Sequence, residues 1–248
     1  MLYLLYLDTE HVSDPLFLEE LARHFHEHPV GHRRALIVHG SSEKVERTFE
    51  SDGVFIEREN GMLPVETDEQ RRLLERDVRE TNQSIVAALT DQVVPTVGVQ
   101  GTDRHLLHRT DDGDIEAAND LGWLDALLKQ HVIAVVSALV PSQKDDGIAE
   151  EVPLPAATKA LATYFASQQI ADEHVQVVVF SDDDTPGISE DDASVADSVA
   201  YTELADTALP HPNLAPYLID AHIPLLVTNL RGFFQGDRPK GTRIVASA

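Results

Sequence analysis

The sequence predicts an α/β protein, a three-layer α/β/α sandwich built around a mainly parallel central sheet. Short apolar runs rich in Val, Ile and Leu recur along the chain, and amphipathic helical patterns separate them. This alternation is typical of a parallel sheet covered on both faces. Apolar residues make up 42% of the 248 residues, enough for such a core. No linker rich in Gly, Ser or Pro and no repeat interrupts the pattern, so we expect one domain over 1–248 with two lobes, 1–150 and 151–248.

The first lobe contains four apolar runs that predict buried strands, at residues 2–7, 34–40, 94–101 and 132–140. Helical periodicity predicts helices at 13–28, 42–53, 67–92 and 119–131. Ser13 is the expected N-cap of the first helix, with Pro15 in its first turn. Thr67 or Asp68 caps the long helix, with a break near Thr81 and Asn82 as an alternative.

Two further segments of the first lobe predict hairpins, at 54–65, turning at Asn60 and Gly61, and at 105–115. The second lobe predicts helices at 153–169, 198–209 and 212–222, and strands at 223–230 and 241–247. Its first strand and the acidic loop that follows span 174–188. We expect six runs to share the central sheet, and they are 2–7, 35–39, 95–99, 133–139, 175–180 and 224–229.

Charge and composition exclude several classes of function. The chain has 43 Asp and Glu against 19 Lys and Arg, a formal net charge of −24, so its surface repels nucleic acid and anionic membranes. We interpret this acidity as halophilic adaptation to a salt-rich cytoplasm, with an acidic partner-binding surface as the alternative. No cysteine is present, which excludes disulfides, thiol catalysis and cysteine metal sites. The apolar start, "MLYLLYL", is too short for a signal peptide or a membrane span, so we expect a cytoplasmic protein.

Several local strings occur in the order found in one known family. "LIVHGSS" (36–42) is similar to a strand that ends in His-Gly-Gly-Gly, and "VVVFSDDDTPGI" (177–188) to a nucleotide-side strand and loop. The end of the chain contains "ALPHPN" (208–213) and "GTRI" (241–244). Together these strings resemble the amino acid kinase family, in particular the acetylglutamate kinases and the catalytic domain of aspartokinases. The resemblance implies the amino acid kinase, or carbamate kinase-like, fold.

The resemblance also implies an activity, the ATP-dependent phosphorylation of a carboxylate in amino acid biosynthesis, with ATP and Mg²⁺ as cofactors if the protein is active. The first lobe would hold the substrate and the second the nucleotide. The implied substrate-binding residues are Gly40, Ser41, Ser42 and Asn82, and the implied nucleotide-binding residues are Ser181, Asp183, Asp184 and Gly187. The expected partners are a small-molecule ligand (a nucleotide or an amino acid derivative) and a second copy of the chain in a homo-oligomer, a dimer. Neither nucleic acid nor a membrane is expected.

The sequence departs from this family where charge is needed. Asp8, Thr9 and Glu10 replace a Lys-x-Gly-Gly segment, and Asp8 would repel a γ-phosphate by a few kcal/mol at an effective dielectric of about 20. Other family positions for Arg, Asp and Lys fall on Pro64 (or Val65), Ala157 and Ala208. We therefore expect an activity that is weakened or lost. The alternative is a pseudokinase that acts as a small-molecule sensor or as the partner subunit of an active kinase.

A relocated cation is a further alternative, and Lys159, Arg231 and Lys240 are its candidates. His24 and His28 have metal-ligand spacing, but no carboxylate completes an H-E-x-x-H pattern, and we predict no metal site there. Asp182, Asp183 and Asp184 either bind Mg²⁺ or form a solvated loop, which is the favoured interpretation. We expect any retained ligand to lie between residues 40–42 and 183–187, which follow strands placed as neighbours in the sheet.

Overall fold

A computed structural model describes residues 1–28, 34–59, 61–144, 147–168, 174–181, 184–191, 194–204 and 209–245. The described residues form an eight-stranded sheet, in which the strands lie in the order β12-β14-β13-β9-β1-β2-β6-β3. Its strands are β1 (Leu2–Leu7), β2 (Arg34–His39), β3 (Thr96–Gln100), β6 (Ile133–Ser137), β9 (Val175–Phe180), β12 (Ser198–Ala200), β13 (Leu225–Thr228) and β14 (Thr242–Val245). All neighbours from β13 to β3 are parallel, and β14 is antiparallel to β13. The mainly parallel sheet that the sequence predicts is confirmed, with all six expected runs in it.

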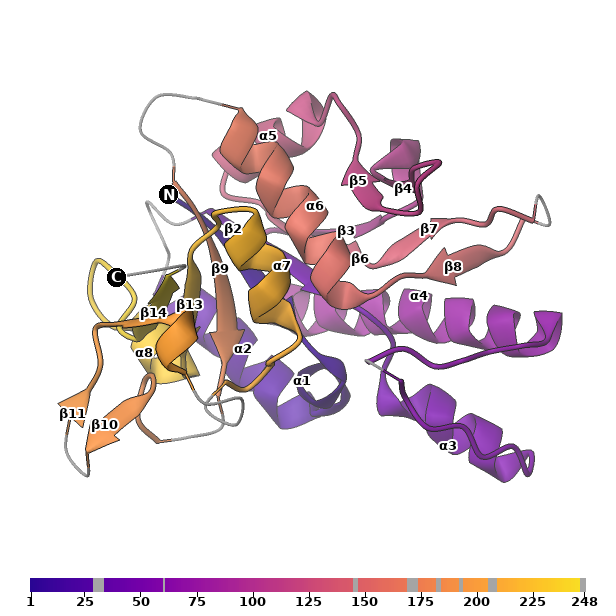
Figure 1. Cartoon of the computed structure of the whole chain (residues 1–248), viewed down its shortest axis with the longest axis horizontal. Coiled ribbons are helices and arrows are strands. Elements are labelled where there is room, and N and C mark those ends of the chain that lie inside the picture. Colours follow the sequence, from indigo (N-terminus) through magenta and orange to yellow (C-terminus); the bar gives the residue numbers. More distant parts are fainter. Residues whose placement is uncertain are drawn as a thin grey trace.

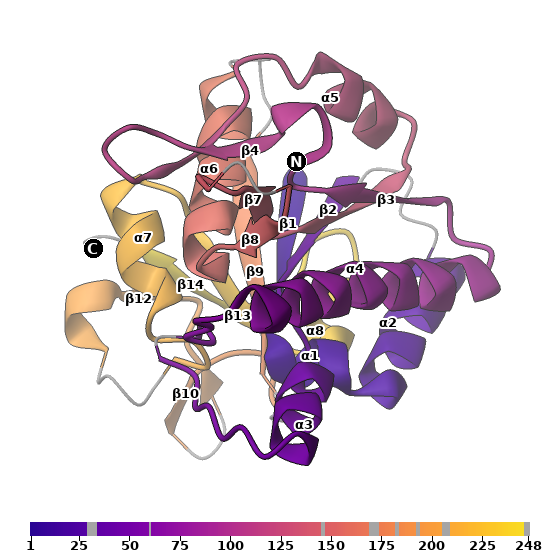
Figure 2. The same ribbon diagram turned by 90° about the vertical axis from the view of Figure 1, so that its right-hand side faces the viewer.

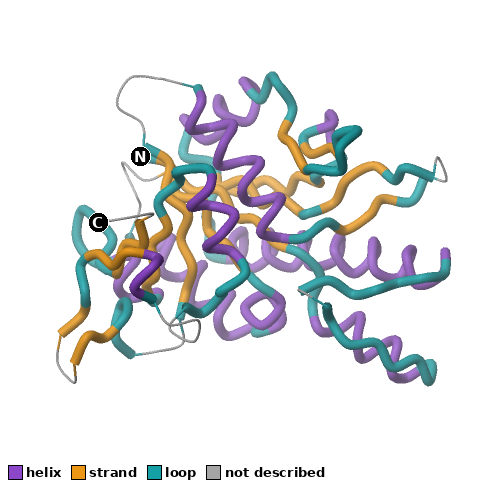
Figure 3. Tube along the Cα trace, in the orientation of Figure 1, coloured by secondary structure: helices purple, strands orange, loops and turns teal. Residues whose placement is uncertain are grey.

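Helices cover both faces of the sheet, which gives three layers, and a hydrophobic core lies between the sheet and the helices on each face (Figure 1). Along β1 the side chains alternate, so that Leu4 and Tyr6 join one core while Leu5 and Leu7 join the other. The first core is completed by α5 (Gly122–Lys129), α6 (Leu154–Ser167) and α7 (Leu214–Asp220). The second is completed by α1 (Thr9–Ser13), α2 (Pro15–Glu27), α4 (Asp68–Asp91) and α8 (Leu230–Phe234). Figure 3 shows the helices on either side of the strands.

Shorter elements lie outside the sheet. Helix α3 (Glu43–Ser51) packs Val45 and Phe49 against Leu63 and Leu74 in a small core of its own. Figure 2 shows α3 below α4, which crosses the strands. Antiparallel pairs are β4 (Leu107–Arg109) with β5 (Ile115–Ala117), β7 (Leu139–Pro141) with β8 (Ala149–Glu151), and β10 (Ser189–Asp191) with β11 (Ser194–Val195). Two 3₁₀ turns cover Asp103–His105 and Tyr201–Glu203. Among the described helices, none has the length and apolar character needed to cross a membrane.

The β4–β5 pair confirms the hairpin expected at 105–115, whereas other boundaries differ from the prediction. The helix expected at 198–209 is wrong, because its first residues form β12 beside β14 and then a 3₁₀ turn, while 205–208 lie outside the described residues. The helix expected at 13–28 is α2, which begins at Pro15 with Asp14 as its N-cap. Ser13, the expected N-cap, is instead the last residue of α1. The strand expected at 132–140 divides into β6 and β7. The hairpin expected at 54–65 retains a Glu59–Met62 bridge, and Asn60 lies outside the described residues.

Helix α4 is continuous, so the break considered near Thr81 and Asn82 does not occur. Its start is a capping box, in which the Gln70 N–H donates to Thr67 Oγ1 (3.2 Å) and Gln70 Oε1 accepts from the Thr67 N–H (3.0 Å). Thr81 and Asn82 are both buried, and polar side chains in a helix interior need partners when they face a sheet. Asn82 has such partners in the strands beneath it.

Asn82 ties α4 to two strands. Its Nδ2 donates to the Val135 carbonyl oxygen (2.9 Å) and lies 3.0 Å from Nε2 of His39. Since Nδ1 of His39 lies 2.9 Å from the Gly40 carbonyl oxygen, Nδ1 donates and Nε2 accepts. Burial lowers the pKa of His39 to about 4, which keeps the imidazole neutral for this pattern. Gly98 of β3 leaves the space that the Asn82 side chain occupies.

Replacing Asn82 should therefore weaken the fold. We expect Asn82→Ala to lower the free energy of unfolding by about 1–3 kcal/mol, because the buried His39 Nε2 and Val135 oxygen lose their donor. Urea denaturation in concentrated KCl measures this change. Ser84→Ala on the same helix is the control, since that exposed hydroxyl bonds only a helix carbonyl, and it should change stability by less than about 0.5 kcal/mol. Equal effects of the two substitutions would contradict the structural role of Asn82.

Candidate functional site

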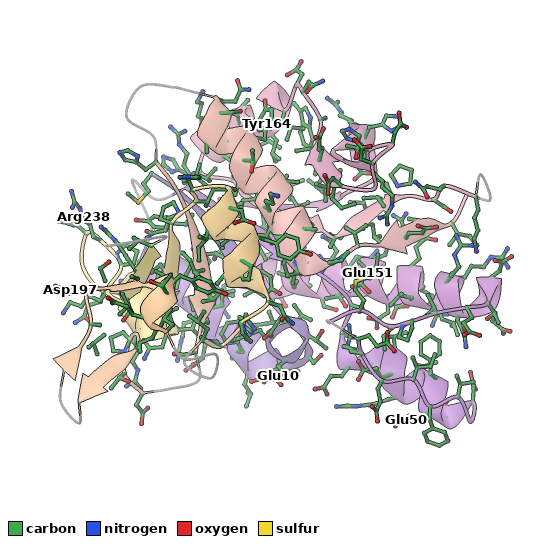
Figure 4. The ribbon with its side chains drawn as sticks, viewed as in Figure 1. Glu10, Glu50, Glu151, Tyr164, Asp197 and Arg238 are labelled. Carbon is green, nitrogen blue, oxygen red and sulfur yellow. The ribbon has the colours of Figure 1, made fainter. Side chains whose placement is uncertain are left out.

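A cleft of about 330 Å³ opens at the carboxyl ends of β1 and β2, where ligands of open α/β sheets bind. Asp8 and Gly40, which follow these two strands, line it. Arg58, Glu151 and His211 line it from more distant parts of the chain. Figure 4 labels Glu151 where β8 meets α4, and Glu10 on α1 at the other side of the cleft. The cleft therefore brings together an acidic strand end, the Gly40 loop and one arginine.

The N–H groups of the Gly40 loop are engaged by the protein's own carboxylates. The Ser41 N–H donates to Oε1 of Glu151 (2.5 Å), and the Ser41 hydroxyl donates to Oε2 (3.0 Å). The Ser42 N–H donates to Oδ2 of Asp77 (2.7 Å), and its hydroxyl lies 2.9 Å from Oδ1. The loop donors are thus bonded to carboxylates that belong to the protein itself.

Burial raises the pKa of both carboxyl groups. It raises the pKa of Glu151, against the opposing effects of the Arg58 charge and of the hydrogen bonds from Ser41. It also raises the pKa of Asp77, against the hydrogen bonds from Ser42. Gly40 is required beside Glu151, because a Cβ atom at this position would lie 2.5 Å from Oε1.

Arg58 is a cation of this cleft that the sequence analysis missed. Its Nη2 donates to the Ser41 hydroxyl (3.1 Å) and to the Ser42 carbonyl oxygen (3.3 Å), and Nη1 donates to the Gly61 carbonyl oxygen (3.1 Å). Its Nε forms an ion pair with Glu46 of α3. The candidates for a relocated cation, Lys159, Arg231 and Lys240, are not among the lining residues.

Asp8 occupies the end of β1, where the family resemblance places a lysine. One carboxylate oxygen accepts from the His11 N–H (2.9 Å) and from Nδ1 of the same residue (2.7 Å), so Asp8 is the N-cap of α1. The other oxygen lies 3.1 Å from Nε2 of His211. Burial alone would raise the pKa of Asp8, but the His11 hydrogen bond and the charges of His11 and His211 outweigh it and lower the pKa.

The described residues of the segment expected to bind nucleotide make hydrogen bonds and close packing contacts within the protein. The Ser181 N–H donates to the Thr228 carbonyl oxygen (2.8 Å), and the Asp184 carbonyl oxygen accepts from Nδ2 of Asn229 (3.0 Å). Gly187 packs so closely on β14 that an added Cβ would lie 2.6 Å from Oγ1 of Thr242. None of these expected residues lines the cleft at Gly40, and Asp183, like its neighbour 182, lies outside the described residues.

The expectation that 40–42 and 183–187 follow neighbouring strands is wrong, because β1 lies between β2 and β9. Of the expected substrate-binding residues, Gly40 lines the cleft. Ser41 and Ser42 donate hydrogen bonds to the carboxylates of Glu151 and Asp77. Asn82 is buried and hydrogen-bonded to His39. Ala157 is buried in α6 and Ala208 lies outside the described residues.

Glu151, Asp77 and His211 were missed along with Arg58, since each lies far along the chain from the loop or strand end that it contacts. One available signal was "LPHP", the string that contains His211.

Three solved structures with this fold cover nearly the whole chain. Isopentenyl phosphate kinase is 18% identical, with a TM-score of 0.64 and coverage of 98% of this chain and 100% of that one. N-acetylglutamate synthase from Neisseria gonorrhoeae, in complex with coenzyme A and N-acetylglutamate, is 18% identical, with a TM-score of 0.72 and coverage of 100% and 60%. Aspartate kinase from Synechocystis is 16% identical, with a TM-score of 0.63 and coverage of 99% and 40%.

No protein-family model matches the sequence, and no curated protein sequence matches it. The identities to the solved structures are low, so the likeness is one of fold. The chain has the α/β fold of amino acid kinase-like proteins, which confirms the fold predicted from the sequence.

The contact between Gly40 and Glu151 can be tested by a double-mutant cycle. We expect Gly40→Ala to destabilise the protein by about 1–3 kcal/mol, since the new methyl group displaces a carboxylate that Ser41 and Arg58 hold in place. In a Glu151→Ala background the same methyl group meets no carboxylate. The two free-energy changes, measured by urea denaturation, should then be non-additive by more than about 0.5 kcal/mol. Simple addition would show that the clash is not the cause.

The raised pKa of Glu151 has a consequence for the pH dependence of stability. A carboxyl group with a raised pKa in the folded state holds its proton more tightly when folded, so its favourable contribution is lost as pH rises from about 4.3, the unfolded value, through the folded pKa. The Glu151→Gln variant has no titrating group at this position, so its stability does not show this decrease. The free energy of unfolding of the variant minus that of the parent should increase as pH rises through this window. Urea denaturation at a series of pH values measures it, and a difference that falls with pH would contradict the raised pKa.

Proposed function

We propose that this chain is an amino acid kinase-fold protein without phosphotransferase activity, which binds a small amino acid-like molecule in the cleft at Gly40. The protein would act as a sensor of this molecule or as the partner subunit of an active kinase. The observation that carries the proposal is that Glu151 and Asp77 already engage the N–H groups of Ser41 and Ser42.

Phosphoryl transfer needs positive charge and free hydrogen-bond donors around the transferred group. At this cleft the loop donors are bonded to carboxylates, and the end of β1 carries Asp8. Among the lining residues the acidic side chains are Asp8, Glu10 and Glu151, and the arginine is Arg58. A triphosphate in this position would meet more repulsion than attraction, which argues against transfer from ATP.

A molecule with one carboxylate and one amino group fits this charge pattern better. Arg58 would face the carboxylate while it keeps its ion pair with Glu46, and Glu10 and Glu151 would face the amino group while Glu151 keeps its bonds to Ser41. Leu154, Pro155 and other apolar residues line the cleft as well, and its volume of about 330 Å³ lies in the range of small-molecule pockets. The ligand class is therefore a free amino acid or a close derivative.

An ATP-dependent kinase acting on a carboxylate, such as an acetylglutamate kinase or an aspartokinase, is the second candidate. Its support is the fold shared with isopentenyl phosphate kinase and aspartate kinase, together with a cleft at the carboxyl ends of β1 and β2. This candidate requires ATP with Mg²⁺, and it requires a ligand to displace the Glu151 carboxylate from Ser41. The cost of breaking those bonds in a buried site makes it the less favoured candidate.

The two candidates differ in turnover. We expect no ADP release above background with MgATP and acetylglutamate, aspartate or isopentenyl phosphate in concentrated KCl, because the cleft lacks the charge that stabilises the transferred phosphoryl group. A coupled assay that detects ADP measures this. Turnover in the ordinary kinase range, about 1–100 per second, would refute the proposal.

Ligand binding is tested by calorimetric titration of free and N-acetylated amino acids, with MgATP and MgADP in parallel. We expect one amino acid-like compound to bind and Arg58→Gln to weaken it by about tenfold or more, since a charge-assisted hydrogen bond is lost. Arg47→Gln is the matched control, because Arg47 is an exposed arginine paired with Glu43 on α3. Equal binding by the two variants would place the ligand elsewhere.

A further inference from the structure

We propose that Asp8, His11 and His211 form a binding site for one divalent transition-metal ion, with Zn²⁺ as the best-suited ion. Each residue offers one ligand atom, and the three atoms lie within 4.8 Å of one another. The proposal does not depend on the amino acid-like ligand of the cleft, and no catalytic step is assigned to the ion.

The spacing of the ligand atoms is close to what Zn²⁺ needs. Asp8 Oδ1 lies 2.7 Å from Nδ1 of His11, and Oδ2 lies 3.1 Å from Nε2 of His211. Ligands at bonds of about 2.1 Å in tetrahedral geometry are about 3.4 Å apart, so small side-chain movements would admit the ion. Two imidazoles and a carboxylate are a set that binds Zn²⁺, whereas Mg²⁺ prefers oxygen ligands alone.

His11 supplies a second, independent observation. Its imidazole is buried, with 7% of its surface exposed, and its Nε2 has no hydrogen-bond partner among the described residues. With Nδ1 bound to the ion, Nε2 would carry the ring proton, and the imidazole would be neutral, as a metal-bound histidine is. Phe17 and Phe180 pack against the His11 ring, with centroids 4.4 and 6.3 Å away, and form an apolar wall of the kind that surrounds protein metal sites.

The site has an entry path and a backbone scaffold. Asp8 and His211 both line the cleft at Gly40, so an ion reaches them from solvent. Asp8 and His11 are fixed by the first turn of α1, where the His11 N–H donates to Asp8. His211 lies in the loop before α7, and its ring packs 5.1 Å from that of Tyr6. Three protein ligands leave a fourth position for water or for a molecule in the cleft.

A second group of potential ligands, His24, Glu27 and His28 on α2, provides the internal control. It has the one-turn spacing noted in the sequence, but Glu27 and His28 are exposed, and solvent-exposed ligands bind metal less tightly than a buried set. His28→Gln removes one of its ligands without touching the cleft.

The experiment is a titration of the metal-free full chain with Zn²⁺ by calorimetry, and with Co²⁺ by visible absorption. We expect one ion per chain and the strong visible bands of a low-coordinate Co²⁺ site. His211→Gln should weaken binding by at least about tenfold, whereas His28→Gln leaves it unchanged, and excess Mg²⁺ competes with neither ion. Asp8→Asn is the second variant, chosen because asparagine retains the N-cap of α1.

Unfolding temperatures provide an independent readout, since an ion that binds only the folded chain raises them. Zn²⁺ should raise the unfolding temperature of the parent and of His28→Gln, and raise it less in His211→Gln. The proposal is overturned if the parent binds no Zn²⁺, or if His28→Gln rather than His211→Gln removes the binding. Either result would leave Asp8 as the N-cap of α1 in contact with the two histidines.

Discussion

The hydrogen bonds from the Gly40 loop to Glu151 and Asp77 join the parts of the molecule around the cleft. Ser41 is bonded to a carboxylate 110 residues away at the end of β8, and Ser42 to one on α4. These contacts hold the end of β2, the β7–β8 pair and the long helix together. Burying two carboxylates is costly unless hydrogen bonds satisfy them, and the backbone and hydroxyl donors of the loop do so. The same bonds therefore occupy the donors that an external anion would need.

The sheet could be predicted from sequence because each central strand is buried on both faces. Residues such as Leu4 and Leu5 face opposite cores, which requires a continuous apolar run that is visible without a structure. The helix predicted at 198–209 was wrong because the structure there depends on a distant part of the chain. Its first residues become a strand only because β14, from the end of the chain, pairs with them, and local helical periodicity contains no trace of that partner. The order of the strands could not be predicted from the sequence either, because nothing local indicates that β1 lies between β2 and β9.

The candidate site was predictable only at the strand ends. Asp8 and Gly40 follow apolar runs, and the rule that parallel strands end at one edge is enough to bring them together. Arg58 and Glu151 enter from a loop and a short hairpin whose positions depend on tertiary packing. In a chain with 43 acidic residues, no local signal marks Glu151 as the one that is buried against the loop. The sequence predicts an external ligand at Gly40, and the structure shows in addition an internal carboxylate, Glu151, bonded to the loop that follows.

Asp8, at the end of β1, is held by contacts with its neighbours and is not an isolated acidic residue. Its carboxylate caps α1 by accepting from the His11 N–H, and a lysine at this position has no acceptor to offer that helix. The same carboxylate contacts both His11 and His211. Exchanging Asp8 for a cation would therefore remove the cap, leave the His11 N–H without this acceptor and still leave Ser41 bonded to Glu151. The contacts of Asp8 and those of Ser41 are separate sets of hydrogen bonds, so a phosphate-binding arrangement at this cleft would require both sets to change.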